Sequence, residues 1–454
     1  MKLKFLGGAG MVTGVNYLIE TKISSGKPTK ILIDCGLFHG SSLLEKKNYE
    51  DFSFNPKEID FVLITHAHLD HIGRLPKLYK EGFRGQILAT FPTIDFSRLM
   101  LYDSQKILAR KIREQRLSPP YEKKDVEKVL GLMKGIEYHK KIKLKQGTFC
   151  RFLDAGHVLG SAIIELWIEN KKIVFSGDLG NPPVPLLRPT EFVDEADYVL
   201  VESTYGNRLH EEKEKRRDLL ENAVEDIITK GGTLMIPSLA LERTQELLYE
   251  LNELVENRRI PRIPIFIDAP LAIKALEVYK KHSRYYNKEA AYLIKSGDDL
   301  FKFHDLVFTE TVEESKRINN IEPPKIIIAG SGQCTGGRII HHAVRYLPDK
   351  KNTILFISFQ AEGTTGREIL DGIKQVEILD KIISIRAKVK SISGYSTHAD
   401  QEMLRNWIDK IKRPIKRVFV VQGEEEPSLA LAQLIKDHLG ISTSVPKLNE
   451  VVEL

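Results

Sequence analysis

Four residues with metal-binding side chains lie close together in the segment THAHLDH at 65–71, directly after an apolar run that reads as a buried strand. Residues two apart on an extended backbone point to the same side, so His66 and His68 can bind one cation. Asp70 and His71 follow where the chain turns toward a helix, and they can reach a second cation beside the first. This ligand set favours zinc, with manganese or iron less preferred. A His-rich surface loop without function is the competing interpretation.

Three other strand-like segments end in a residue of the same kinds, and functional side chains concentrate at such ends. His157 lies in DAGH at 154–157, and Asp178 ends FSGD at 175–178. Asp34 follows an apolar run, and we expect it to orient a histidine or a bridging water rather than to bind metal itself. Separate parts of the chain therefore repeat the chemistry of the histidine cluster, which makes a chance cluster less plausible.

In their order along the chain, these residues resemble the motifs of the metallo-β-lactamase superfamily. The resemblance implies a four-layer αββα sandwich with two metal ions at one edge. It assigns His66, His68 and His157 to the first ion, Asp70 and His71 to the second, and Asp178 to both. A pair of cations activates water as a nucleophile near neutral pH and offsets charge on a phosphoryl oxygen. We therefore expect two zinc ions, with manganese as the alternative.

A second group of residues narrows the resemblance to one branch of this superfamily. Glu202 lies in VESTYG at 201–206, and His398 lies in SGYSTHAD at 393–400. These segments resemble the first and second motifs of the β-CASP branch, whose members cut RNA or DNA. The resemblance implies that Glu202 holds the imidazole of His398 so that it protonates the leaving oxygen, which is typically worth about 10²–10⁴ in rate. Glutamate in the first motif favours RNA, and the chain resembles a compact bacterial relative of the endonuclease subunit of the cleavage and polyadenylation factor.

One position departs from the family pattern. RNA-cutting β-CASP proteins carry a histidine after a strand in a Val-His-Gly-Glu setting, where it completes the ligands of the second metal. Here the segment is FVVQGE at 419–424, so that Gln422 stands where the histidine is expected. An amide oxygen is a poorer zinc ligand than imidazole, although it suits harder cations. We therefore include Gln422 among the ligands of the second metal and expect that site to be weak.

The elements that must position these residues fall into three parts of the chain. Strand-like runs dominate 1–206, and strand–helix alternation typical of parallel βαβ units fills 207–386. The β-CASP resemblance explains that alternation as an α/β domain inserted into the metallo-β-lactamase domain, whose closing part is 387–454. Inside the insert, two Gly-rich stretches follow buried strands and offer backbone N–H groups to phosphates. The residues expected to contact phosphate or RNA there are Ser331, Gly332, Arg338, Ser358 and Arg367.

Composition sets the broad class of the protein. The 454 residues are 42% hydrophobic and 29% charged, which is typical of an ordinary globular chain, and no apolar run has the length of a membrane span. The net charge of +6 permits a polyanionic partner without requiring one. Three cysteines, far apart in sequence, do not suggest a disulfide framework and favour a reducing, cytoplasmic location.

Together these features predict a metal-dependent ribonuclease that cuts single-stranded RNA, endonucleolytically, in RNA processing or decay. We expect no membrane partner and leave a homodimer open. Two alternatives remain at this point. A small-molecule metallohydrolase shares the metal site, although it needs no inserted domain with phosphate-type loops. An RNA-binding protein with an impaired second metal site would follow if Gln422 abolished catalysis.

Overall fold

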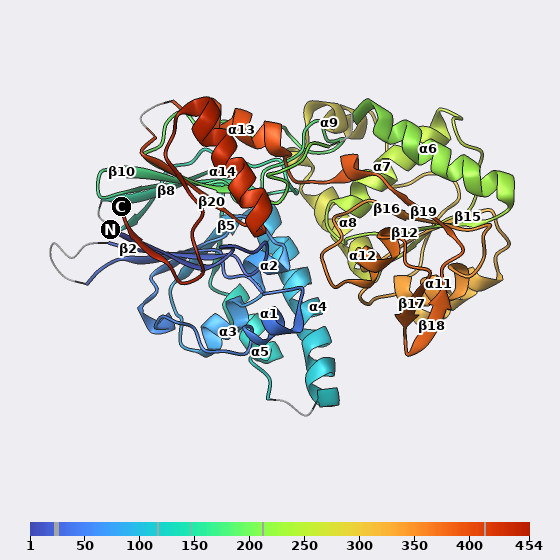
Figure 1. Cartoon of the computed structure of the whole chain (residues 1–454), viewed down its shortest axis with the longest axis horizontal. Helices are drawn as coiled ribbons and strands as arrows, with labels where there is room; N and C mark the ends of the chain where they lie inside the picture. Colours follow the sequence, from blue (N-terminus) through green and yellow to red (C-terminus); the bar gives the residue numbers. More distant parts are fainter. Residues whose placement is uncertain (22–26, 116–117, 146, 211–212, 413–414) are drawn as a thin grey trace. The chain divides into compact units, whose positions relative to one another are not determined.

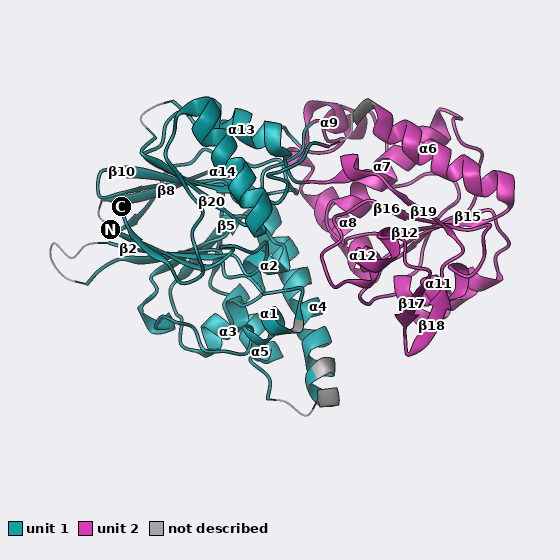
Figure 2. Ribbon diagram, in the orientation of Figure 1, with its two compact units in different colours: residues 1–182, 188–209, 398–454 teal, residues 183–187, 210–397 magenta. Residues whose placement is uncertain are grey.

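The computed structural model describes residues 1–21, 27–115, 118–145, 147–210, 213–412 and 415–454 (Figure 1). The chain divides into two compact units, and the second is inserted in the first (Figure 2). Unit 1 comprises residues 1–182, 188–209 and 398–454, and unit 2 comprises residues 183–187 and 210–397. Within the described residues, no helix has both the length and the apolar composition that a membrane crossing requires.

Unit 1 is built on two seven-stranded sheets, counted over the described residues. The strand order in the first sheet is β22 (Val451–Glu453), β1 (Lys2–Gly7), β2 (Asn16–Glu20), β3 (Lys30–Ile33), β4 (Phe61–Leu63), β5 (Gln86–Thr90) and β6 (Met133–Ile136). The order in the second is β21 (Thr443–Ser444), β20 (Arg417–Val421), β11 (Tyr198–Glu202), β10 (Lys171–Phe175), β9 (Ala162–Ile168), β8 (Thr148–Asp154) and β7 (Ile142–Lys145).

Aromatic side chains from both sheets form the core of unit 1. The rings of Phe5 and Phe419 lie 5.4 Å apart between centroids, and those of Tyr17 and Phe175 lie 6.4 Å apart. Burial of such rings is the largest apolar contribution that single residues make to a core. Each pair joins a strand of the first sheet to a strand of the second, so the two sheets pack face to face.

Helices cover the outer faces of this pair of sheets (Figure 1). The helices beside the first sheet are α1 (Ser42–Lys46), α2 (Leu69–Ile72), α3 (Leu75–Lys80), α4 (Phe91–Gln115) and α5 (Lys123–Leu130). On the second sheet, α13 (Gln401–Asp409) and α14 (Glu425–Leu439) pack Trp407 and Ile435 against Val174 and Val201. The order helix, sheet, sheet, helix is the αββα sandwich that the sequence predicts.

Unit 2 contains a six-stranded sheet in which every described pairing is parallel. Its strand order is β14 (Leu306–Phe308), β13 (Ile265–Asp268), β15 (Lys325–Ala329), β12 (Thr233–Pro237), β16 (Thr353–Phe356) and β19 (Lys388–Ser391). The helices of this unit are α6 (Lys213–Lys230), α7 (Arg243–Glu256), α8 (Pro270–Lys281), α9 (Lys288–Lys295), α10 (Val312–Arg317), α11 (Ile339–Tyr346) and α12 (Thr365–Leu370). This is the parallel βαβ architecture expected for the insert.

The end of unit 2 differs from the boundary that the sequence suggests. The expected insert stops at 386, whereas the structure continues unit 2 to residue 397. The reason is that β19 pairs with β16 along its whole length, from Lys388 opposite Thr353 to Ser391 opposite Phe356. Such a non-local pairing leaves no local signal in the sequence. The closing part of unit 1 therefore begins at His398.

A close backbone approach fixes the loop after β3 against α2. Cys35 N–H donates to the carbonyl of His71 at 2.7 Å, and Gly36 lies beside the backbone of Asp70. A Cβ atom added to Gly36 would lie 1.5 Å from the carbonyl oxygen of Asp70. Only glycine fits this contact, so a short-range constraint in unit 1 sets the position of two predicted metal ligands.

We predict that Gly36→Ala lowers the free energy of unfolding by at least about 2 kcal/mol, because the new methyl group must displace the backbone of α2. Chemical denaturation monitored by circular dichroism measures the change. Gly336→Ala is the matched control, since a Cβ there meets nothing within 4 Å. Equal stabilities of the two variants would contradict the constraint.

Candidate metal centre

The centre forms where strands of both sheets end. His66 and His68 follow β4 and lead into α2, which carries Asp70 and His71. Asp178 follows β10 after Gly177, whose φ of +55° suits glycine. The parallel strands β10, β11 and β20 end side by side, because β11 pairs with both neighbours. Residues far apart in the sequence thus converge at one edge of unit 1.

Three ring nitrogens and one carboxylate oxygen form a first group that could hold a metal ion. His68 Nδ1 lies 3.0 Å from His66 Nε2 and 3.2 Å from His157 Nε2. Asp178 Oδ2 lies 3.5 Å from His66 Nε2 and 3.4 Å from His157 Nε2. Four atoms bound tetrahedrally at the usual zinc–nitrogen distance lie about 3.3 Å apart. The donor set and its spacing are therefore compatible with a metal ion of the size of zinc.

The protonation of these rings suits metal binding. Burial lowers the pKa of His68 to about 4 and lowers that of His66 well below its ordinary value. Both imidazoles are consequently neutral at pH 7, which is the form that binds a cation. Burial would raise the pKa of the Asp178 carboxyl, but His71, His66 and His157 hold it well below its usual range. Asp178 is therefore a carboxylate.

A second group lies on the other oxygen of the same carboxylate. His71 Nε2 is 3.3 Å from Asp178 Oδ1 and 3.8 Å from Asp70 Oδ2. The amide nitrogen of Gln422 is 2.5 Å from Asp178 Oδ1 and 3.1 Å from His71 Nε2. Position 422 thus completes the second group, with an amide in place of a ring. The two oxygens of Asp178 face the two groups.

Asp34 lies behind this second group, as its place in the sequence suggests. Asp34 Oδ2 is 2.7 Å from His71 Nδ1, and both Asp34 oxygens accept hydrogen bonds from Thr65 at 2.8 Å and 2.7 Å. A carboxylate on Nδ1 leaves Nε2 of the same ring directed toward a metal. Burial lowers the pKa of His71, but Asp178 and Asp34 raise it well above the ordinary value.

The predicted pair of Glu202 and His398 is brought together beside Asp178. His398 Nδ1 lies 3.0 Å from Glu202 Oε2 and 3.8 Å from Asp178 Oδ2. Glu202 is fully buried, and its Oε1 accepts the N–H of Leu179 at 2.7 Å. A buried carboxylate with fixed partners holds an imidazole in one orientation.

The loop before His398 is anchored within unit 2 by residues that sequence reasoning missed. Arg216 donates to the carbonyl of Gly394 at 3.2 Å and forms a buried ion pair with Glu250. The hydroxyl of Tyr395 also donates to Glu250. Tyr395 is fully buried, so its ring packs inside unit 2. The segment SGYSTHAD at 393–400 identified this loop in the sequence, whereas no local pattern identifies Arg216 or Glu250.

The two Gly-rich stretches of unit 2 lie against each other after β15 and β16. The side chain of Gln360 donates to the carbonyl of Gly332 at 3.0 Å, and Ser358 Oγ lies 3.4 Å from the same oxygen. Ser331 Oγ is 3.4 Å from the carbonyl of Gly336 in its own loop. The carboxyl ends of parallel strands are common ligand positions. Phosphate contact by Ser331, Gly332 and Ser358 stays a prediction.

The two arginines expected at phosphate also make contacts within the protein. Arg338 donates to Asp268 Oδ1 at 2.6 Å and to the carbonyls of Thr309 and Glu310 at 2.9 Å and 2.7 Å. Arg367 pairs with Asp371 at 2.9 Å. These contacts give Arg338 a structural role that the sequence did not indicate. Phosphate binding by either side chain stays a prediction.

Three family models match parts of the chain. Residues 24–194 match the metallo-beta-lactamase superfamily domain, residues 244–369 the Beta-Casp domain, and residues 382–446 the Zn-dependent metallo-hydrolase RNA specificity domain. The solved structure of a protein of unknown function from Enterococcus faecalis superposes on this chain with a TM-score of 0.57. The superposition covers 100% of this chain and 99% of that protein. At 13% identity, that likeness concerns the fold alone.

Curated relatives align along nearly the whole chain. Ribonuclease TTHA0252 of Thermus thermophilus is 38% identical over 96% of this chain and 96% of its own length. The RNase J-like protein of Methanocaldococcus jannaschii is 31% identical, covering 98% of this chain and 97% of its own. Transcription termination factor FttA of the same organism is also 31% identical, but only 70% of it is covered.

The contacts of Asp268 predict how stability depends on pH. Burial would raise its pKa, but hydrogen bonds from His342, Ser315, Thr309 and Arg338 hold it at about 2. A carboxyl whose pKa is lowered by folding stabilises the fold at neutral pH, by about 2 kcal/mol here, and loses this contribution between about pH 4 and pH 2.

We therefore predict that Asp268→Asn costs about 2 kcal/mol at pH 7 and progressively less below pH 4. Urea unfolding of both proteins across this pH range measures the difference. Asp371→Asn, which removes only an exposed partner of Arg367, should change stability by less than about 0.5 kcal/mol at each pH. A cost for Asp268→Asn that does not vary with pH would contradict the assigned pKa.

Proposed function

Because the chain belongs to the β-CASP family of the metallo-β-lactamase superfamily, we propose that this metallo-hydrolase is an endoribonuclease acting on single-stranded RNA. One observation carries the proposal, namely two ligand groups that share the carboxylate of Asp178, with His398 held by Glu202 next to them. When bound there, two zinc ions would supply an activated water and offset charge on the phosphodiester. Homologues named as ribonucleases support RNA as the substrate.

The residues of the chain have distinct roles in this proposal. Asp178 would help to hold both cations, because its two oxygens face the two groups. Asp34 orients His71, while Glu202 keeps His398 directed at the leaving group. Glu202 also stabilises the positive charge of the imidazolium, so that His398 delivers its proton to the departing oxygen.

RNA cutting gives a role to both units of the chain. A small-molecule metallohydrolase would use unit 1 and leave unit 2 without a task. The FttA relatives bear a name from transcription termination, but this chain covers 70% of the one from Methanocaldococcus jannaschii. We therefore propose RNA cleavage, rather than termination, as the activity of this chain. A homodimeric state stays a prediction.

We predict that the purified protein cuts a single-stranded RNA oligomer with zinc or manganese and loses this activity after exhaustive chelation. His398→Ala should lower the rate by about 10²–10⁴ without changing the zinc content, because it removes the proton donor and none of the proposed ligands. Product mapping on end-labelled RNA and elemental analysis provide the two measurements.

The control is His438→Ala, which removes an exposed histidine on α14 and should leave the rate unchanged. Undiminished RNA cutting after chelation would overturn the proposal. Turnover of a thioester panel faster than RNA would instead favour the small-molecule hydrolase. Binding of RNA without any cleavage would favour the impaired-site alternative.

Gln422 makes the two metal sites unequal in this proposal. The first site has three imidazoles and one oxygen of Asp178. The second has Asp70, His71, the other oxygen of Asp178 and an amide, which is a weaker zinc ligand than imidazole. We infer that the first site fills at lower metal concentration than the second, and that the rate rises as the second fills.

We predict that Gln422→His raises the zinc content after mild dialysis from about one toward two ions per chain, with higher activity at limiting metal. Elemental analysis after dialysis decides the stoichiometry independently of activity. The matched control is Gln433→His on the exposed face of α14, which should leave both quantities unchanged. Two tightly held ions in the unmodified protein, with no effect of Gln422→His, would show that position 422 does not limit the second site.

A further inference from the structure

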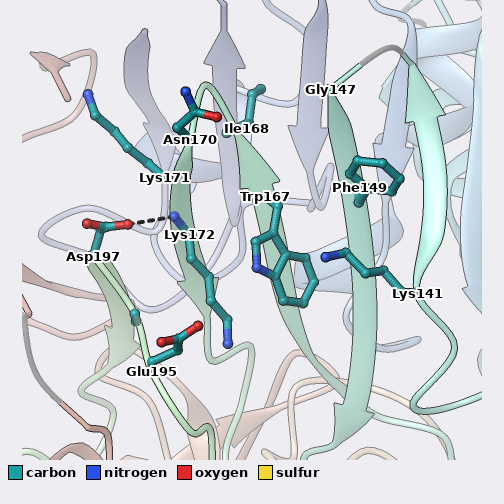
Figure 3. A pocket seen from close by; sticks show the side chains of 11 residues that line it. Lys141, Gly147, Phe149, Trp167, Ile168, Asn170, Lys171, Lys172, Glu195 and Asp197 are labelled. Atoms are coloured by element: carbon teal, nitrogen blue, oxygen red, sulfur yellow. Dashed lines mark hydrogen bonds between the residues drawn. The ribbon is translucent and has the colours of Figure 1, made fainter.

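A concave surface lies on the second sheet of unit 1 (Figure 3). It is an open cavity of about 530 Å³. The residues that line it are Lys141, Gly147, Phe149, Trp167, Ile168, Asn170, Lys171, Lys172, Glu195, Ala196 and Asp197. We call this surface the Trp167 pocket. Its size is within the range of pockets that hold a nucleotide-sized group.

The Trp167 pocket and the metal centre lie at opposite ends of the same strands. Lys171 and Lys172 begin β10, whose last residue Phe175 comes three positions before Asp178. Asp197 directly precedes β11, which ends at Glu202. Five strand residues span about 17 Å, so a ligand in this pocket does not touch the metal ligands. The pocket is a separate site.

An aromatic ring with several cations is the main feature of the pocket. Phe149 and Trp167 are paired across β8 and β9, and both side chains remain partly exposed. Lys141 Nζ lies 4.1 Å from the centroid of the Trp167 ring, and Lys172 Nζ lies 5.0 Å from it. Figure 3 shows the amine of Lys141 directed toward the indole. Cations attracted to the ring concentrate positive charge around an indole that a base can stack on.

Most acidic groups around the pocket already have partners. The buried carboxylate of Glu165 pairs with Lys172 at 2.6 Å and also with Arg151. Asp197 pairs with Lys416 at 2.9 Å. No ion pair of Lys141 or Lys171 occurs among the described residues. The charges that remain in the lining are these two ammonium groups and the carboxylate of Glu195. This excess of positive charge favours the binding of an anion.

We propose that the Trp167 pocket binds single-stranded nucleic acid, with a base stacked on Trp167 and backbone phosphates beside Lys141 and Lys171. Every base has a π-face, so a partly exposed indole can recognise a strand without reading its sequence once the ammonium group of Lys141, which lies over the ring, moves onto a phosphate. This inference rests on the proposed function, since it makes the pocket a distal contact for the RNA that is cut. A long RNA engages both sites, whereas a short one engages the metal centre alone.

Binding is tested with metal removed by EDTA, so that no cleavage interferes. The chain has two tryptophans, and Trp407 is 2% exposed. Titration with a single-stranded oligouridine should therefore quench the fluorescence of Trp167 in the full-length protein. Trp167→Phe keeps a ring for packing and should abolish the quench. Trp167→Ala should weaken binding, measured by anisotropy of a labelled oligomer, by at least about fivefold.

Charge and control variants complete the binding experiment. Lys141→Met and Lys171→Met should each weaken binding and reduce its salt dependence. Phe192→Ala, which removes a 57% exposed aromatic ring of unit 1 outside the pocket lining, should bind as the unmodified protein does. An equal quench at equal affinity with uridine monophosphate would overturn the proposal, because it would indicate a mononucleotide site.

Cleavage separates this proposal from the proposed function. With zinc restored, Trp167→Ala should raise the KM for a long RNA about fivefold or more and leave a short RNA of the same cut site unchanged. If the unmodified protein cuts RNA and Trp167→Ala binds and cuts it equally well, the Trp167 pocket has no such role and the proposed function stands. If the unmodified protein cuts no RNA, the proposed function fails, while the titration in EDTA still decides nucleic-acid binding.

Discussion

The carboxylate of Asp178 is buried among imidazole rings, and the rest of the centre depends on how that charge is balanced. A buried carboxylate is costly unless cations or hydrogen-bond donors surround it. His66 and His157 approach one of its oxygens, while His71 and Gln422 approach the other. The neighbours are held in place in turn. Asp34 accepts hydrogen bonds from Thr65 and contacts His71, and Gly36 allows the close approach of the α2 backbone. The αββα sandwich brings all of these residues to one edge through strands that end together.

The two units contribute to this edge in different ways. Unit 1 provides the described ligand groups and the Glu202 carboxylate from its strand ends. Unit 2 contributes through chain connection, because its last residues, up to 397, run directly into His398. The buried contacts of Arg216 and Glu250 with Gly394 and Tyr395 fix the loop from which His398 emerges.

Local patterns were sufficient to identify the side chains that the structure brings together, because each lies within a few residues of a strand end, whereas the sandwich followed from the resemblance to the metallo-β-lactamase superfamily. The 65–71 cluster needs only the alternation of an extended chain to bring His66 and His68 together. Local patterns could not predict pairings between residues that are far apart in the sequence. The pairing of β19 with β16 moves the end of unit 2 from 386 to 397, and Arg338 is paired with Asp268, 70 positions earlier. The Trp167 pocket likewise depends on the register of β8 and β9, which aligns Phe149 with Trp167.

Gln422 contacts the buried carboxylate of Asp178 and also lies at the proposed second metal site. An amide and a neutral imidazole carry the same net charge, so the exchange does not alter the charge balance around Asp178. The difference is that one end of the amide donates and the other accepts. As placed, its nitrogen donates to Asp178 Oδ1 and so stabilises the carboxylate without a second cation. Rotation of the amide by half a turn brings its oxygen to the same position, where it can bind a cation beside His71. Because these two states exclude each other, filling the second site that we propose would break the hydrogen bond from Gln422 to Asp178, and this cost would add to the weaker affinity of an amide ligand.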